Sequence, residues 1–264
     1  MPDQKKIGLV LGGGGARGIA HIGVLKILER ENIKPNILCG CSMGALVGSC
    51  YAVGMPLSEI EGIALALRKR DFLKWLNISK PSSSLVKGQR VFEFVHSLVG
   101  DKKFSDTILP FSVMTTNLEN GQETILESGS IALAVQASIS VPGIFPPVKI
   151  NGKYLIDGGV VNPTPIDVVE KMGANTIIGV DLMLKNEVKL ENPGIITTLL
   201  QSYEIIRNQS VRQKINHLDS EIILICPEIR STLDSFKFSD IAKLIASGER
   251  AAEKELGRLK NLVK

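Results

Sequence analysis

The chain has 264 residues, of which 44% are hydrophobic and 22% are charged, and this composition excludes a disordered chain. Its formal net charge of +4 is mild and does not resemble the concentrated basic stripe of a nucleic-acid-binding protein, so we expect no nucleic-acid partner. The four cysteines (Cys39, Cys41, Cys50 and Cys226) match neither a zinc site nor a small disulfide framework, and they predict free, buried thiols in a reducing compartment.

We expect no targeting signal at the N-terminus of this sequence. Its short apolar run ends at the glycines after residue 11, which is too short for a signal peptide, and no window approaches a membrane-spanning helix. We therefore expect a cytoplasmic protein with at most peripheral contact to the inner face of a membrane.

The first part of the chain alternates predicted strands and helices. Residues 6–11 and 36–41 are short apolar runs typical of buried strands. Residues 18–31 carry apolar side chains at helical spacing, and a helix of small residues begins near Met43. The order strand, helix, strand, helix predicts a parallel sheet with helices packed on it.

The next segment is less regular. Ser58 is a predicted N-cap, because Glu61 follows it at the spacing of a capping box. Residues 71–87 hold a Pro-Ser-Ser-Ser run and scattered apolar side chains, which predict a loop or a lid-like insertion. A further helix is expected at about 89–99.

One stretch of that insertion combines cations with apolar side chains. Residues 68–70 (Arg-Lys-Arg) precede Phe72-Leu73-Lys74-Trp75-Leu76. Such a combination suits contact with anionic lipid. The alternative is an ordinary helix end that packs its tryptophan into the core.

The remainder of the chain returns to regular patterns. Asn-Gly dipeptides at 120–121 and 151–152 are flanked by strand-like runs and predict two hairpins. Core strands are expected at 175–182 and 221–226, and long helices at about 195–216 and 238–260. Since there is neither an internal repeat nor a long linker, we predict a single domain over 1–264.

The glycine-rich loop at residues 12–18 allows more than one function. Gly13, Gly15 and Gly18 fit the dinucleotide pattern G-x-G-x-x-G, which also needs an acidic residue about 20 positions later. No Asp or Glu occurs from Ile33 through Met55, and no Gly-Lys-Ser/Thr follows the glycines, so both nucleotide interpretations lose support. A tight turn and an oxyanion hole remain, the latter because glycine N–H groups at a helix start can stabilise a negative oxygen.

A second motif supplies a nucleophile. Gly40-Cys41-Ser42-Met43-Gly44 matches the nucleophile elbow G-x-S-x-G, between a predicted strand and a predicted helix. Ser42 is then the nucleophile, and the N–H of Met43 is a further oxyanion donor.

The three histidines offer no convincing base for this serine. Only His217 follows late enough for the order of an α/β-hydrolase triad, and it lies at the polar end of a helix, where we expect it to be solvated. His21 is expected to pack or cap near the glycine loop, and His96 to be structural.

Asp157 has a better context. It ends a predicted hairpin strand in YLIDGGVVNPTP and precedes two glycines that leave its carboxylate unobstructed. A carboxylate within hydrogen-bond reach of a serine can take its proton directly if burial raises the carboxyl pKa. A plain Asp-Gly turn is the alternative.

Together, three motifs resemble those of the patatin-like phospholipase family: Gly13 to Gly18, the elbow at 40–44, and Asp157-Gly158-Gly159. A weaker match, ASISVPGIFPPV at 137–148, resembles a segment that this family carries just before its aspartate. The resemblance spans about residues 6–182, and the tail at 183–264 carries no recognised motif.

The resemblance implies a three-layer α/β/α fold with a mainly parallel central sheet, as in the small bacterial members. It makes Ser42 the nucleophile and Asp157 its base, in a dyad without histidine. Gly13, Gly14 and Gly15 become the oxyanion loop.

Arg17 falls on the family's basic position in the loop, where it would order the loop or bind a lipid phosphate; a solvent-facing arginine is the alternative. The implied activity is hydrolysis of fatty-acyl esters of phospholipids or lysophospholipids through an acyl-enzyme, with no cofactor and no metal. A non-enzymatic regulatory or lipid-binding protein that keeps the pocket is the alternative, and the sequence does not indicate an oligomeric state.

Overall fold

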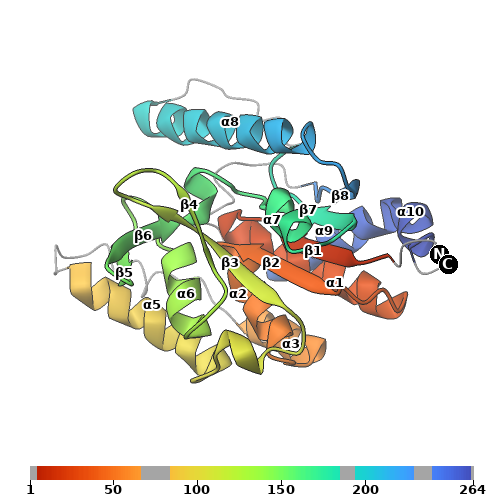
Figure 1. Cartoon of the computed structure of the whole chain (residues 1–264), viewed down its shortest axis with the longest axis horizontal. Helices are drawn as coiled ribbons and strands as arrows, with labels where there is room; N and C mark the ends of the chain where they lie inside the picture. The colour runs from red at the N-terminus through yellow and green to blue at the C-terminus, as the bar shows by residue number, and fades with distance from the viewer. Residues whose placement is uncertain (1–4, 67–83, 185–193, 229–239, 263–264) are drawn as a thin grey trace.

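A computed structural model describes residues 5–66, 84–184, 194–228 and 240–262 (Figure 1). The strands are β1 (Ile7–Leu11), β2 (Ile37–Cys41), β3 (Phe111–Asn117), β4 (Glu123–Leu126), β5 (Val148–Ile150), β6 (Lys153–Asp157), β7 (Thr176–Val180) and β8 (Glu221–Ile225). The helices are α1 (Ala20–Arg30), α2 (Met43–Ala52), α3 (Leu57–Ala66), α5 (Ser84–Val99), α6 (Ile131–Ser138), α7 (Ile166–Lys171), α8 (Ile195–Ile215), α9 (Ile241–Lys254) and α10 (Leu256–Lys260). Short 3-10 helices are η1 (Gly15–Ile19), η2 (Phe104–Asp106) and η3 (Gly158–Val160).

These strands form one eight-stranded sheet in the order β5-β6-β3-β2-β1-β7-β8, with β4 paired to β3. Strands β3, β2, β1, β7 and β8 are parallel, and β4, β5 and β6 pair antiparallel. Both predicted hairpins are present: 120–121 connects β3 to β4, and 151–152 connects β5 to β6. Asn151 and Gly152 have φ of 50° and 81°, the left-handed values that a tight hairpin turn requires.

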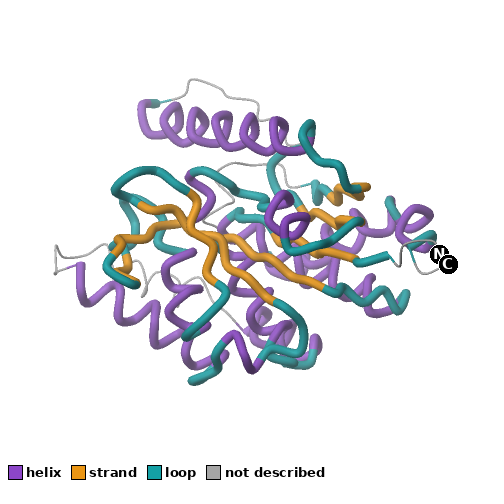
Figure 2. The backbone as a smooth tube through the Cα atoms, viewed as in Figure 1, coloured by secondary structure: helices purple, strands orange, loops and turns teal. Residues whose placement is uncertain are grey.

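Helices cover both faces of the sheet (Figure 2). Alternate residues of β1 point to opposite sides, so Leu9 and Leu11 pack with α1, α2, α3, α6 and α9, while Val10 packs with α7. Helix α8 lies beyond α7 on that second side (Figure 1). The predicted three-layer α/β/α fold is confirmed.

Several boundaries differ from the sequence predictions. Helix α3 begins at Leu57, because the Pro56 carbonyl accepts the N–H groups of Glu59 and Ile60 at 2.9 and 3.1 Å. Ser58 therefore lies inside the first turn and is not the N-cap, and Glu61 forms an ion pair with Lys26 instead of closing a capping box.

The other differences concern helix ends. Helix α5 already begins at Ser84, so residues 84–87 are helical and not loop, and the helix expected at about 238–260 is divided at Glu255 into α9 and α10. Residues 67–83, including Trp75 and the cations before it, lie outside the described residues. The buried thiols are confirmed for Cys39, Cys41 and Cys50, whereas Cys226 is only half-buried.

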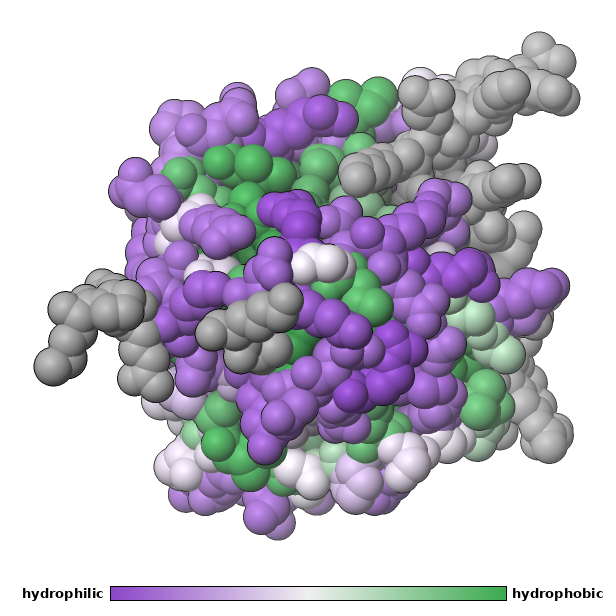
Figure 3. All heavy atoms as spheres, turned by 90° about the vertical axis from the view of Figure 1, so that its right-hand side faces the viewer, coloured by the Kyte–Doolittle hydropathy of each residue, from purple (hydrophilic) through white to green (hydrophobic). Residues whose placement is uncertain are grey.

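The surface of the described residues includes exposed apolar side chains on α8. In the part of the chain that the structure describes, no helix has both the length and the apolar character needed to cross a membrane. The face that corresponds to the right-hand side of Figure 1 is mainly hydrophilic in its described residues (Figure 3). By contrast, Ile195, Leu199 and Ile206 of α8 are 82%, 65% and 64% exposed.

The register of β3 explains how distant motifs meet. Residues 113–116 of β3 pair with β4 on one edge. Strands β2 and β6 must therefore share the other edge, where Cys41 is opposite Met114 and Asp157 is opposite Thr115. Since β2 is parallel and β6 antiparallel to β3, the carboxyl ends of β2 and β6 face each other. The residue after β2 is Ser42, which is thus brought to Asp157.

Candidate active site

Ser42 lies on a sharp turn between β2 and α2. Its φ of 52° and ψ of −122° are strained for a residue with a side chain, at a cost of about 1–3 kcal/mol. The two flanking glycines are required by packing: a Cβ on Gly40 would lie 2.5 Å from the Cα of Ala45, and a Cβ on Gly44 would overlap the carbonyl of Leu11. The predicted elbow therefore forms, because only small residues allow α2 to pack this close to the sheet.

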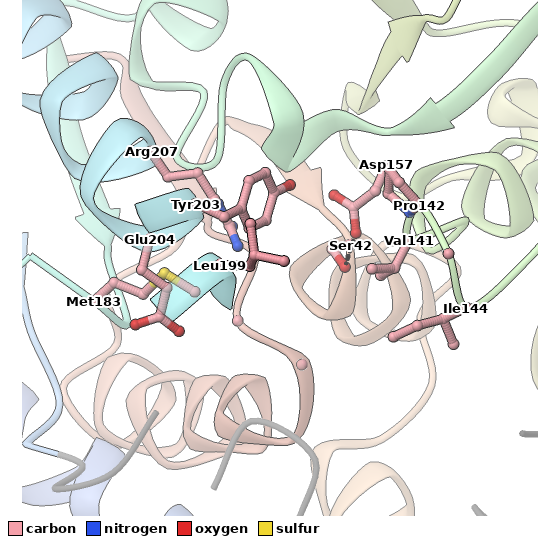
Figure 4. Close-up of a pocket in the computed structure, with 13 residues that line it drawn as sticks. Ser42, Val141, Pro142, Ile144, Asp157, Met183, Leu199, Tyr203, Glu204 and Arg207 are labelled. Atoms are coloured by element: carbon pink, nitrogen blue, oxygen red, sulfur yellow. Dashed lines mark hydrogen bonds between the residues drawn. The ribbon is translucent and has the colours of Figure 1, made fainter. Parts of the chain in front are cut away.

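Ser42 and Asp157 contact each other directly (Figure 4). The Oγ of Ser42 donates a hydrogen bond of 2.7 Å to Oδ2 of Asp157. Both side chains are almost fully buried, at 6% and 5% exposure. The pair that the sequence placed 115 positions apart is within proton-transfer distance, and its catalytic role stays a prediction.

The surroundings of Asp157 set its protonation. Burial raises the pKa of its carboxyl group, and the positive charge of Arg207 and the hydrogen bonds from Ser42 and the Gly159 N–H oppose that rise. The Gly159 N–H donates to Oδ1 at 2.7 Å. This second bond fixes the carboxylate and leaves Oδ2 for the serine.

The segment before Asp157 holds both members of the pair. Ser138 Oγ accepts the backbone N–H of Ser42 at 2.8 Å and donates to the carbonyl of Met114 at 2.7 Å. The carbonyl of Ser140 accepts the N–H of Asp157 at 3.1 Å. The weaker sequence match at 137–148 thus has a physical function, which is to clamp the backbones of nucleophile and aspartate.

The glycine loop differs in part from the prediction. The N–H of Gly13 donates to the carbonyl of Pro163 at 2.8 Å, so Gly13 anchors the loop and its N–H is not available as an oxyanion donor. Gly14 and Gly15 line the pocket next to Ser42, and Gly15 has a φ of 57° that favours glycine. Among the described residues, no hydrogen bond occupies the N–H of Gly14, Gly15 or Met43.

Arg17 does not reach the pocket. Its side chain is 1% exposed, its Nη2 pairs with Glu204 of α8 at 2.7 Å, and its Nε lies 3.4 Å from the carbonyl of Gly14. Burial lowers the pKa of Arg17, and Glu204 opposes that shift. The alternative of a solvent-facing arginine is wrong, because the guanidinium is buried and ties α8 to the loop. Its expected role in ordering the loop agrees with these contacts, and binding of a lipid phosphate stays a prediction.

The three histidines stay outside the pocket lining. His21 is fully buried, and its Nε2–H donates to the carbonyl of Gly12 at 2.7 Å. Burial lowers its pKa to about 4, so it is neutral and supports the loop as a hydrogen-bond donor. His217 is exposed, as predicted, and half-exposed His96 lies 3.0 Å from Asp101.

A cavity of about 410 Å³ opens above the Ser42–Asp157 pair. Its walls are mainly apolar: Val141, Pro142, Ile144, Met183 and Leu199. Helix α8 adds Tyr203, Glu204 and Arg207 (Figure 4). Sequence reasoning missed these three residues, because an aromatic and two charged side chains on a long helix look like an ordinary solvated face. Within the described ranges, no group of three or more His, Cys, Asp or Glu could hold a metal ion.

Comparison with known proteins identifies the family of this chain. The family model described as patatin-like phospholipase matches residues 9–169, and the chain belongs to this family. It is 35% identical over 193 residues to neuropathy target esterase sws of Drosophila melanogaster, and 35% identical over 183 residues to lysophospholipase NTE1 of Scheffersomyces stipitis. The matches cover 71% and 68% of this chain but only 14% and 12% of those relatives.

A solved structure shows the same fold. The crystal structure of VipD from Legionella pneumophila aligns with 97% of this chain and 67% of that chain, with a TM-score of 0.56 and 16% sequence identity. At that identity the likeness extends to the fold alone.

Proposed function

We propose that this chain is a serine acyl hydrolase that cleaves fatty-acyl esters of phospholipids or lysophospholipids through a Ser42–Asp157 dyad. The observation that carries the proposal is the 2.7 Å hydrogen bond from Ser42 Oγ to Asp157 Oδ2 beneath an apolar cavity. Family membership and the lysophospholipase relative support the same activity.

The first half-reaction forms an acyl-enzyme. Asp157 takes the proton of Ser42 Oγ while that oxygen attacks the ester carbonyl carbon. The N–H groups of Gly14, Gly15 and Met43 stabilise the tetrahedral oxyanion. The intermediate collapses, the ester C–O bond breaks, and the leaving alcohol oxygen takes the proton from Asp157.

The second half-reaction restores the enzyme. Asp157 takes a proton from water, whose oxygen attacks the acyl carbon. Collapse releases the fatty acid, and the proton returns to Ser42 Oγ. The apolar walls of the cavity suit the acyl chain in both steps.

Substitution of each dyad residue tests the mechanism. We expect Ser42→Ala to abolish hydrolysis of a p-nitrophenyl acyl ester, and Asp157→Asn to lower kcat by about a hundred- to ten-thousandfold. Ser140→Ala is the matched control, because this variant keeps the backbone carbonyl of residue 140 that accepts the Asp157 N–H. Full activity of Ser42→Ala would refute the mechanism, and a wild type without any ester turnover would favour a non-enzymatic lipid-binding protein.

The single-domain prediction enters the same proposal. The tail beyond residue 182 supplies α8, which forms a wall of the pocket, and α9, which packs on α1. Helices α9 and α1 cross so closely at Gly248 and Gly23 that a Cβ on either would overlap the other helix's backbone. We propose one catalytic domain in which the tail completes the site.

We also propose peripheral contact with the cytoplasmic face of a membrane. Ile195, Leu199 and Ile206 lie on one side of α8, and Leu199 also lines the pocket, so lipid could pass from this surface to Ser42. Ile206→Glu is expected to weaken co-sedimentation with anionic liposomes. Ile108→Glu, at a 70% exposed site outside α8, is the control, and equal losses in both variants would contradict the proposal.

A further inference from the structure

Arg207 is a buried cation in the pocket that has no proton-transfer or oxyanion role in the proposed dyad mechanism. Its residue is 8% exposed, yet its guanidinium borders the cavity. Among the described residues, it has no ion pair within 4.0 Å, and its Nε has no hydrogen-bond partner. Since burying an unpaired charge is costly, an anion brought by the substrate would relieve a real energetic deficit.

The chain makes room for this guanidinium with glycines from two separate motifs. A Cβ on Gly13 would lie 3.0 Å from Nη2 of Arg207, and a Cβ on Gly159 would lie 2.7 Å from Nη2 and 3.0 Å from Cζ. The ring of Tyr203 supports the other side, with its centroid 5.3 Å from Cζ. Arg207 is therefore held between the loop, the Asp-Gly-Gly turn and α8, and it points toward Ser42 (Figure 4).

Neither nearby carboxylate satisfies this cation. Glu204 is already paired with Arg17 at 2.7 Å. Asp157 uses Oδ2 for Ser42 and Oδ1 for the Gly159 N–H. Asp157 is close enough to feel the charge of Arg207 but forms no ion pair with it, and it loses its own charge when it takes the serine proton.

We propose that Arg207 forms an anion subsite that binds the phosphate of a phospholipid head group while Ser42 attacks the acyl ester. The subsite rests on the proposed function, and it predicts that the enzyme prefers a phospholipid to a neutral glyceride. A guanidinium binds phosphate with two parallel N–H donors, which makes Arg well suited to this task.

The spacing fits a single lipid molecule. A Cβ placed on Gly13 would lie 3.0 Å from Nη2 of Arg207 and 3.3 Å from Cβ of Ser42, so the cation and the nucleophile are close neighbours on either side of Gly13. The glycerol unit of one lipid can bridge the two groups, with its phosphate at Arg207 and its ester at Ser42. The apolar walls then receive the acyl chain, which favours a lipid phosphate over inorganic phosphate.

The catalytic test compares two substrates with the same acyl chain, a lysophospholipid and a monoacylglycerol. The measured ratio is kcat/KM for the lysophospholipid divided by kcat/KM for the monoacylglycerol. Arg207→Gln is expected to lower this ratio by about ten- to a hundredfold, the change that corresponds to loss of a charged hydrogen bond. Arg207→Lys should restore part of the ratio. Arg212→Gln, an exposed position on the same helix, is the control and should leave the ratio at the wild-type value.

The ratio separates substrate recognition from an effect on Asp157. A change in the protonation of Asp157 alters both substrates equally and cancels in the ratio. An unchanged ratio in Arg207→Gln, however far both rates fall, would overturn the proposal.

A binding test does not depend on turnover. The Ser42→Ala protein is titrated with an ether-linked lysophospholipid, with the same ether lipid lacking phosphate, and with inorganic phosphate. We expect the phosphate-bearing ether lipid to bind best, and Arg207→Gln in the Ser42→Ala background to remove that preference. Inorganic phosphate that binds as tightly as the ether lipid would overturn the head-group assignment.

The two proposals can fail separately. A wild type that hydrolyses no ester but retains Arg207-dependent binding of the ether lipid would refute the proposed function and support the subsite. Thermal unfolding of every variant confirms that it is folded.

Discussion

Ser138 should couple the stability of the protein to the geometry of its nucleophile. Its hydroxyl is fully buried and bridges the Ser42 N–H, at 2.8 Å, to the Met114 carbonyl, at 2.7 Å. Ser138→Ala removes both bonds and leaves a buried N–H without a partner. An unsatisfied buried group costs about 1–3 kcal/mol, so we expect a loss of about 2–3 kcal/mol in the free energy of unfolding.

The same variant should also slow catalysis. The N–H in question belongs to Ser42, whose φ of 52° is already strained, so the turn can relax once its anchor is lost. A shift of the oxygen away from Asp157 lowers kcat on a neutral ester, and we expect about a ten- to hundredfold loss, the order of magnitude that misplacement of a reacting group costs.

A matched serine provides the control. Ser49 is equally buried, but its hydroxyl donates to the Leu46 carbonyl of its own helix, at 2.8 Å, and does not bridge to the elbow. Ser49→Ala should cost less than about 1 kcal/mol and leave kcat unchanged. Denaturant unfolding and ester hydrolysis are measured on both variants. If Ser138→Ala behaved like Ser49→Ala in both assays, the clamp on the elbow would be refuted.

Three further predictions concern charge. Because burial raises the pKa of Asp157, kcat/KM should begin to fall, as the pH is lowered, at a pH above the ordinary carboxyl range. Arg207→Gln removes a positive charge that opposes this rise, so the fall should begin at a still higher pH. A fall that begins at the ordinary Asp pKa in both proteins would contradict the account. A raised native pKa means that the native state holds the proton more tightly than the unfolded chain. Wild-type stability therefore falls as the pH rises from the unfolded pKa of Asp157 to its native pKa. Asp157→Asn cannot ionise, so it should be more stable than wild type at neutral pH, and this difference should disappear in acid. Equal melting temperatures of the two proteins at every pH would count against this prediction. Arg17→Ala leaves Glu204 unpaired and should lower the unfolding free energy by about 3 kcal/mol, whereas a loss under 0.5 kcal/mol, the usual size for a surface change, would show that the pair does not hold α8 to the loop.

The part of the site that the sequence revealed is the part encoded in short motifs. The elbow around Ser42 and the turn after Asp157 depend on glycines at fixed spacing, and their glycines are required by contacts with neighbouring backbone or side chains. Even the absence of a suitable histidine was informative, because His21 is buried and His217 is exposed.

The rest depends on contacts between distant residues, which a pattern does not contain. The Gly13 N–H reaches the Pro163 carbonyl only once the loop after β1 meets the segment between η3 and α7. Arg17 pairs with Glu204 only once η1 meets α8. Arg207 gave no signal at all, since a single arginine on a helix resembles any solvated residue. Ser58 failed as an N-cap because Pro56 supplied the first carbonyl of α3.

The central claim is that Asp157 activates Ser42 without a histidine. The most direct test is labelling with a fluorophosphonate probe, followed by mass spectrometry of the peptide that contains residue 42. We predict a covalent adduct on Ser42 in the wild type, no adduct in Ser42→Ala, and much slower labelling in Asp157→Asn. Labelling of Asp157→Asn at the wild-type rate, or an adduct on another residue, would contradict the account.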